Sequence, residues 1–222
     1  KGKVMVPLLG DELGKSIAEG QLRLHFSEDG FSVKYFDTAY PLSLSAYPMI
    51  ISMLRSHDNE DSSATVLTKL VESAPGMDYH AWDAARKQHL GSLRENEEEL
   101  QRIESLLTTI NDDQDRLHQV LDQQYYRLTY WKETEERMNY RRFFTVNELI
   151  CLRMEDEKVF DEYHRYLLKL YREKLVDGFR IDHIDGLQDP ARYTRQLRDE
   201  VSDATYIIAE KILEAKEDMP TQ

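Results

Sequence analysis

The chain has 222 residues, of which 41% are hydrophobic and 32% are charged, so it contains enough apolar residues to build a core. Its formal net charge of −13 argues against nucleic acid or an anionic membrane as a partner, because both require a basic face. The sequence has no apolar run near the roughly 20 residues of a membrane span, and its N-terminal apolar stretch is too short for a signal peptide. We therefore expect a cytoplasmic protein.

Metal and disulfide chemistry also find little support in the sequence. Cys151 is the only cysteine, so it has no partner for an internal disulfide and cannot build a cysteine-based zinc site. The histidines are scattered without the spacing of metal ligands. We expect no metal and no cofactor.

The first quarter of the chain reads as short strands and turns. The apolar run 3–9 is interrupted by Pro7, which predicts an edge strand, and the glycines at 10 and 14 bracket a turn and a short helical stretch. Segments 21–26 and 31–36 alternate apolar and polar residues on either side of the turn sequence SEDG. This pattern predicts a β-hairpin, which is followed by a loop between Pro41 and Pro48.

Helical periodicity dominates the middle of the chain. We predict helices over 61–73, over about 79–110, and from a cap at 111–113 to about Trp131. The last two place their apolar residues on one face, so an antiparallel helical hairpin with solvent-exposed acidic runs is the simplest arrangement.

The last third of the chain is predicted to contain a βαβ unit. Segment 139–149 has no clear period, and a helix is expected over about 156–175. Strands are expected at 178–182 and 206–209, paired in parallel, with a helix between them that Asp189 and Pro190 begin. The expected fold class is α+β and mainly helical. We divide it into a hairpin and loop part (1–55), a helical subdomain (56–155) and the βαβ part (156–222).

Both predicted strands of this unit end in an acid, Asp182 and Glu210. The carboxyl ends of neighbouring parallel strands meet at one edge of a sheet, so the two carboxylates are expected to face the same mouth. A carboxylate pair suits glycosidic bond chemistry, in which one acid attacks the sugar and the other protonates the leaving oxygen. Acids also end strands simply as helix caps or solvated loop residues, and spacing alone leaves that alternative open.

The motif DGFRIDHIDGLQDP at 177–190, followed by AEKIL at 209–213, resembles the fourth and fifth barrel strands of the α-amylase superfamily. Within it the sequence is most similar to the maltooligosyltrehalose synthases. The segments PLLGDELG, YFDTAYPLS, NYRRFFTVNEL and LRMED resemble that family's long insertion between the third and fourth strands. The resemblance implies a helical insertion with an N-terminal hairpin, joined to a piece of an incomplete (β/α)8 barrel.

Carried over residue by residue, the resemblance makes Asp182 the nucleophile and Glu210 the general acid/base. Arg180 would keep the Asp182 carboxylate ionised and oriented. His183, Asp185 and Lys211 are expected to contact substrate, although a structural role in the loop is an equal alternative.

The resemblance also places Tyr140, Arg141, Arg142 and Phe143 as a wall near the reducing-end subsites. Aromatic rings stack on sugars and arginines bind hydroxyl groups, so the residue types suit that role. The alternative is that Phe143 and its neighbour Phe144 belong to a core.

The implied reaction of the parent enzyme converts the reducing-end α-1,4 bond of a maltooligosaccharide into an α,α-1,1 bond, for trehalose biosynthesis. The superfamily's third carboxylate and the rest of the barrel are missing from these 222 residues, so we expect the chain alone to be inactive. Two alternatives remain: a 4-α-glucanotransferase, against which the residues 185–187 and 211–213 argue, and a non-catalytic acidic helical interaction module.

Overall fold

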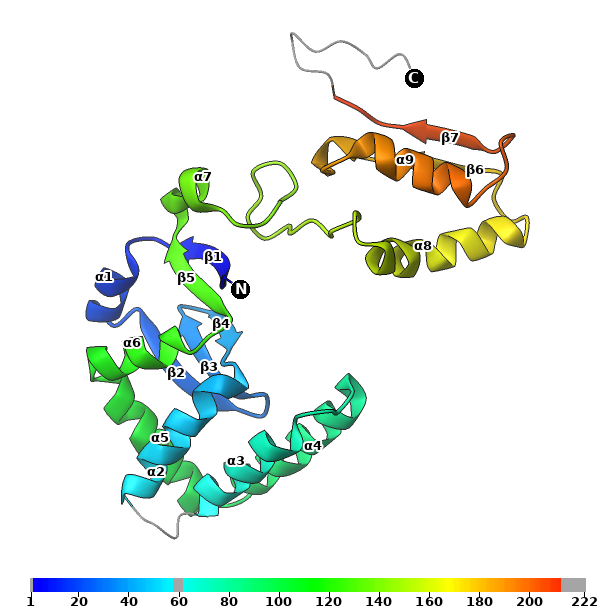
Figure 1. The fold of residues 1–222 in the computed structure, drawn as a ribbon. Helices are drawn as coiled ribbons and strands as arrows, with labels where there is room; N and C mark the ends of the chain where they lie inside the picture. The colour runs from blue at the N-terminus through cyan, green and yellow to red at the C-terminus, as the bar shows by residue number, and fades with distance from the viewer. Residues whose placement is uncertain (1, 58–61, 213–222) are drawn as a thin grey trace. The chain divides into compact units, whose positions relative to one another are not determined.

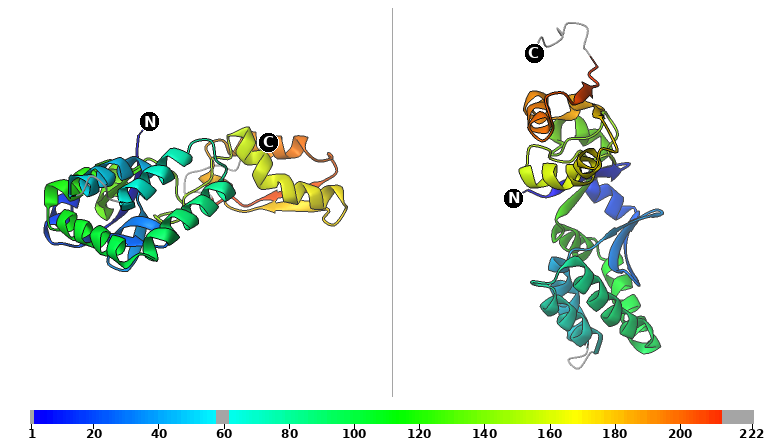
Figure 2. Two further views of the ribbon diagram at one scale, coloured as in Figure 1. Left: turned by 90° about the horizontal axis from the view of Figure 1, so that it is seen from below. Right: turned by 90° about the vertical axis from the view of Figure 1, so that its right-hand side faces the viewer.

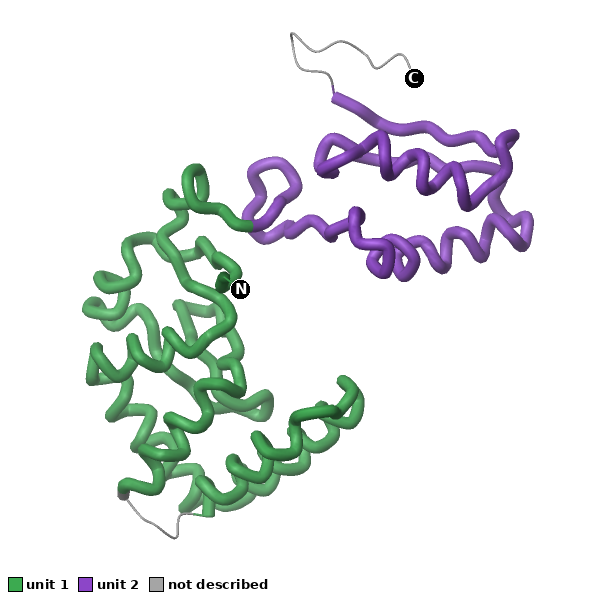
Figure 3. The backbone as a smooth tube through the Cα atoms, viewed as in Figure 1, with its two compact units in different colours: residues 1–139 green, residues 140–222 purple. Residues whose placement is uncertain are grey.

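The computed structural model describes residues 2–57 and 62–212 (Figure 1). The chain forms two compact units, residues 1–139 and 140–222 (Figure 3). The fold is α+β and mainly helical, as predicted. The three-part division of the chain at 55 and 155 stays a prediction.

The first unit contains two small sheets. Strand β1 (Val4–Leu9) pairs in parallel with β5 (Tyr126–Tyr130), and α1 (Leu13–Ala18) follows β1. The predicted hairpin is confirmed as β2 (Leu22–Ser27) and β3 (Gly30–Tyr35), to which β4 (Thr38–Pro41) adds a third antiparallel strand.

The helices of this unit follow the hairpin in chain order. They are η1 (Leu44–Ala46), α2 (Tyr47–His57), α3 (Ser62–Ser73), α4 (Tyr79–Arg94), α5 (Glu97–Asn111) and α6 (Gln114–Asp122), and after β5 come η2 (Trp131–Glu133) and α7 (Thr134–Arg137). The helix predicted over 61–73 is thus confirmed from Ser62, and its first predicted residue lies outside the described part of the chain. The prolines at 41 and 48 predicted a loop where α2 begins.

Two helix predictions were wrong in extent. The single helix predicted over 79–110 is two helices, because the Asn96 side chain accepts hydrogen bonds from the backbone N–H groups of Glu98 and Glu99 and so starts a new helix. The helix predicted to reach Trp131 ends at Asp122. The residues after it alternate and are rich in tyrosine, which fits a strand, and they pair with β1.

One apolar core joins the hairpin, the helices and β5. Its fully buried members include Leu22, Val33, Ile50, Leu67, Leu90, Ile103, Ile110 and Val120. The acidic run 95–98 is exposed as expected, but Glu99 is buried. Its carboxylate accepts hydrogen bonds from both Ser62 and Ser63, which begin α3.

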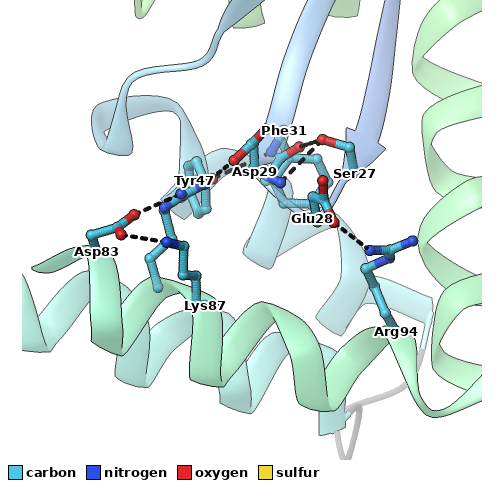
Figure 4. Close-up of polar contacts among 10 residues, drawn as sticks. Ser27, Glu28, Asp29, Phe31, Tyr47, Asp83, Lys87 and Arg94 are labelled. Carbon is cyan, nitrogen blue, oxygen red and sulfur yellow. Dashed lines mark hydrogen bonds and ion pairs between the residues drawn. The ribbon is translucent and has the colours of Figure 1, made fainter.

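The hairpin turn is attached to α4 by ion pairs (Figure 4). Gly30 has φ +100°, and a Cβ there would lie 2.6 Å from the Tyr47 hydroxyl, so only glycine fits this turn. Asp29 pairs with Arg86 at 2.9 Å, and Glu28 pairs with Arg94 at 3.4 Å.

The second unit contains the predicted βαβ arrangement. An irregular segment with one bridge, Arg142 to Ile150, leads to α8 (Glu157–Arg172), β6 (Gly178–Ile181), η3 (Ile184–Gly186), α9 (Pro190–Asp199) and β7 (Tyr206–Ala209). The two strands pair in parallel, as predicted. Asp189 caps α9 by accepting from Arg192 N at 2.8 Å.

Both helices of the second unit run alongside the strand pair (Figure 2). Phe160 and Leu168 of α8 form a small core with Tyr193 and Leu197 of α9, against which apolar side chains of both strands pack. Tyr206 and Ile208 of β7 remain exposed, at 69% and 43%. The strand pair therefore carries apolar side chains that this unit does not cover.

Candidate active site

The parallel register of β6 and β7 places Asp182 and Glu210 side by side. Ile181 and Ala209 are the last paired residues, and each acid follows directly. The backbone N–H of Glu210 donates to the carbonyl of Ile181 at 2.8 Å, which extends the ladder to the acid itself. The structure thus brings together the two carboxylates that the sequence analysis selected.

Arg180 lies between the two acids. One of its guanidinium nitrogens is 3.4 Å from Asp182 Oδ1, and the same nitrogen donates a hydrogen bond to the Glu210 carboxylate. Arg180 precedes Asp182 by two positions, so both side chains project from the same face of the strand. The family resemblance predicted the contact with Asp182 but not the closer one with Glu210.

Asp182 affects the ionisation of Glu210. A hydrogen bond with Asp182 and the negative charge of Asp182 raise the pKa of Glu210, and Arg180 opposes this shift in part. The arrangement favours the protonated form of Glu210 beside Asp182. A general acid must be protonated when its step begins.

An aromatic cluster lies beside the nucleophile candidate. The ring of His183, the residue after Asp182, is centred 4.6 Å from the Phe143 ring and 4.5 Å from the Phe144 ring. His183 and Phe144 both have left-handed backbone conformations, with φ 53° and 49°. Such conformations cost free energy in residues other than glycine and concentrate at functional sites. Phe143 and Phe144 are 36% and 55% exposed, so neither is a core residue in the described structure.

Asp185 and Lys211 contact each other. Lys211 Nζ donates to Asp185 Oδ1 at 2.9 Å, and the backbone N–H of Ile212 donates to Oδ2 at 2.9 Å. The hydrogen bond from Lys211, followed by that from Ile212, lowers the pKa of the Asp185 carboxyl. The pair therefore ties the loop after β6 to the residues after β7. The last residue of the AEKIL motif, Leu213, lies outside the described residues.

Tyr140, Arg141 and Arg142 make contacts within the second unit. The Tyr140 hydroxyl donates to the backbone carbonyl of Asn147 at 2.9 Å, and Arg142 donates to the Asn147 side chain. Arg141 pairs with Glu155 at 2.9 Å. These contacts support the fold of the segment, and the expected contact of the three side chains with substrate stays a prediction.

Sequence reasoning missed Glu155 and Phe144 as members of this region. Glu155 stands in the LRMED segment, where its charge gave no sign that it is mostly buried against Arg141. For Phe144 the sequence suggested only a core position. The signal that was available is the dense arginine and aromatic content of 140–144, which is unusual for an irregular segment.

No protein-family model matches the chain. Over 98 residues it is 45% identical to a Mycobacterium tuberculosis protein (strains CDC 1551 and H37Rv) that carries the provisional name maltooligosyl trehalose synthase. The match covers 44% of this chain and 12% of the relative.

Solved structures match nearly the whole chain. A maltooligosyl trehalose synthase crystal structure superposes on 99% of it with a TM-score of 0.53 and 27% identity, and this chain covers 20% of that protein. A glycosyltrehalose synthase of DSM5389 superposes on 99% of this chain with a TM-score of 0.52 and 29% identity, and this chain covers 22% of that protein. The maltooligosyltrehalose synthase from Arthrobacter ramosus superposes on 99% of this chain with a TM-score of 0.52 and 27% identity, and this chain covers 19% of that protein.

The chain is similar to a part of the maltooligosyl trehalose synthases. It spans about a fifth of the length of the solved synthases and 12% of the curated relatives.

No helix in the described residues is both long and apolar enough to cross a membrane.

Proposed function

We propose that the chain is part of an enzyme that converts the reducing-end α-1,4 bond of a maltooligosaccharide into an α,α-1,1 bond. The observation that carries this proposal is the contact of one arginine, Arg180, with both strand-end carboxylates, Asp182 and Glu210. The similarity to maltooligosyl trehalose synthases supports the choice of reaction.

The proposed first step forms a glycosyl ester. Asp182 attacks the anomeric carbon of the residue next to the reducing end, and the bond from that carbon to O4 of the terminal glucose breaks. Glu210 gives its proton to the departing O4. The raised pKa of Glu210 supports this role, because the acid must be protonated when the step begins.

The second step rejoins the two parts differently. The released glucose turns over in its pocket, and its anomeric hydroxyl gives its proton to Glu210 and attacks the ester carbon. Asp182 leaves as a carboxylate, and two inversions give net retention. Exclusion of water during the turnover separates this outcome from hydrolysis.

Within this enzyme, β6, α9 and β7 would be two strands and one helix of a (β/α)8 barrel that this chain contains only in part. Three observations support this: parallel pairing, acids at the carboxyl ends, and exposed apolar side chains on β7, which neighbouring elements of a barrel would cover. His183, Phe143 and the Asp185–Lys211 pair would border the sugar sites. The first unit would belong to the family's long insertion between the third and fourth strands.

Trapping of the glycosyl ester tests the assignment of roles. The intact enzyme with Glu210→Gln is mixed with α-maltotetraosyl fluoride, whose leaving group needs no acid, so the ester should form and then persist without a base. Mass spectrometry should find a maltotetraosyl adduct on the peptide containing Asp182. The double variant with Asp182→Asn is the control. An adduct elsewhere, or an adduct that survives in the control, would overturn the assignment.

A further inference from the structure

Glu155 joins two parts of the second unit that are far apart in sequence. Its Oε1 accepts a hydrogen bond from Arg141 Nη1 at 2.9 Å and one from the backbone N–H of Gln188 at 2.7 Å. Arg141 also donates from Nη2 to the Gln188 side-chain oxygen at 3.2 Å. Arg141, Glu155 and Gln188 thus form a closed ring of hydrogen bonds, which we call the clamp.

The clamp is built around a buried negative charge. The Glu155 side chain is 13% exposed, and its Oε2 is buried with no hydrogen-bond partner among the described residues. Burial acts to raise the pKa of this carboxyl, but the hydrogen bonds and the charge of Arg141 outweigh burial and lower the pKa to about 2. A buried carboxylate destabilises the folded state unless it is paired, so the Arg141 guanidinium is needed as the ion-pair partner of Glu155.

The two sides of the clamp lead directly to the candidate active site. On one side, Arg141 accepts a hydrogen bond from the Cys151 backbone N–H at 2.9 Å, which closes the segment 141–151 into a loop that carries Phe143. On the other side, Gln188 ends the loop that begins at His183. The rings of Phe143 and His183 are in contact, so the two loops meet at that contact and at the clamp.

We propose that Glu155 is a positioning residue that fixes the Phe143 loop against the loop that follows the nucleophile. The reaction it serves rests on the function proposed above. Glu155 has no direct role in the chemistry, since it acts through Arg141 and Gln188. The proposal also gives Arg141 a supporting role in place of the direct sugar contact that the sequence suggested.

Replacement of Glu155 in the intact enzyme tests the proposal. Glu155→Gln should lower kcat/KM for isomerisation of maltopentaose about 10- to 100-fold and raise the hydrolysed fraction, because a displaced pocket wall misplaces the acceptor and admits water. Hydrogen exchange at the Cys151 amide should become faster. The matched control is Glu162→Gln, which removes an exposed pair with Arg165 on α8 and should change none of these quantities.

A double variant separates positioning from general destabilisation. If both residues act through one clamp, Arg141→Gln combined with Glu155→Gln should lose little more activity than either change alone. Losses that multiply would overturn the proposal, as would wild-type kcat/KM, product ratio and exchange in Glu155→Gln. If Glu155→Gln does not fold, Glu155→Asp serves instead, since its shorter side chain cannot reach both partners.

The two proposals can fail separately. If the intact wild-type enzyme forms no 1,1-linked product, the proposed function is wrong, and the clamp is then judged by hydrogen exchange. Faster exchange at Cys151 in Glu155→Gln than in Glu162→Gln supports the clamp, and equal exchange overturns it.

Discussion

The backbone N–H of Glu210 donates to the carbonyl oxygen of Ile181, and this hydrogen bond brings the Glu210 carboxyl beside that of Asp182. The ladder between two short parallel strands therefore determines the geometry of the candidate active site. Arg180 adds the positive charge that the two acids share. Removal of either Asp182 or Arg180 should change the ionisation of Glu210, in opposite directions.

Asp182→Asn should lower the pKa of Glu210, because Asp182 is the main cause of its raised value. Arg180→Ala should raise that pKa further, because Arg180 opposes the shift. In the intact enzyme the alkaline limb of the pH–activity profile should therefore move to higher pH in Arg180→Ala, whose activity should also fall about 100-fold or more. Arg195→Ala on the exposed face of α9 is the control. An alkaline limb at the same pH in Arg180→Ala as in wild type would contradict the assignment of Glu210 as the general acid.

Gly178→Ala should destabilise the second unit by about 2 kcal/mol or more. An added Cβ would lie 2.4 Å from the backbone oxygen of Tyr206, so β6 and β7 would have to separate. Thermal unfolding of the intact enzyme, monitored by limited proteolysis within residues 140–212, measures the loss of stability. Gly91→Ala in α4 meets nothing within 4 Å and should be neutral or stabilising. Equal stability of the two variants would be the contrary result.

Glu99→Ala should destabilise the first unit by about 1–3 kcal/mol, because it leaves the start of α3 without its acceptor. Burial acts to raise the Glu99 pKa, but hydrogen bonds from Ser62 and Ser63 outweigh it and lower the pKa. The stabilisation should be present above the unfolded-state pKa and be lost as the pH falls through the folded-state value. Denaturant unfolding at pH 7 and pH 3 measures this, with Glu98→Ala as the exposed control. A difference in unfolding free energy between the variants that does not change with pH would argue against the Glu99 carboxylate as the acceptor at the start of α3.

His164 should make the second unit sensitive to acid. Its ring is buried between the Phe160 carbonyl and the Tyr193 hydroxyl, each at 2.8 Å, and burial lowers its pKa below 6.5. The unfolded state therefore binds a proton more readily, so stability should fall as the pH drops below about 6.5. Unfolding of wild type and His164→Gln from pH 7.5 to 5 should show their difference shrinking. A constant difference would mean that the folded and unfolded states protonate His164 equally, which would contradict this prediction.

The sequence predicted the β-hairpin and the βαβ unit because their signals are local. Alternation around SEDG, and the Asp189–Pro190 start of α9, are read directly from neighbouring residues. The break at Asn96 was missed because the apolar stripe continues across it in register, and only the cap divides the helices. Strand β5 was missed because its partner β1 lies more than a hundred positions away.

The candidate site likewise contains residues that local sequence patterns predict and residues that only distant contacts bring together. Asp182 and Glu210 were predicted because both expected strands end in an acid, and the family resemblance added Arg180. The clamp was missed because it depends on contacts of an irregular segment, for which no periodic pattern exists. Glu155 and Gln188 are 33 positions apart, and only the folded chain shows that they meet.

The most direct test of the proposed function is to incubate the intact enzyme with maltopentaose and to follow reducing ends and chain length together. The proposal predicts that reducing power falls while every chain keeps five glucose units, and that Asp182→Asn abolishes the change. Longer and shorter chains with unchanged reducing power would identify a glucanotransferase instead. No change in either quantity would contradict a catalytic role for the Asp182–Glu210 pair.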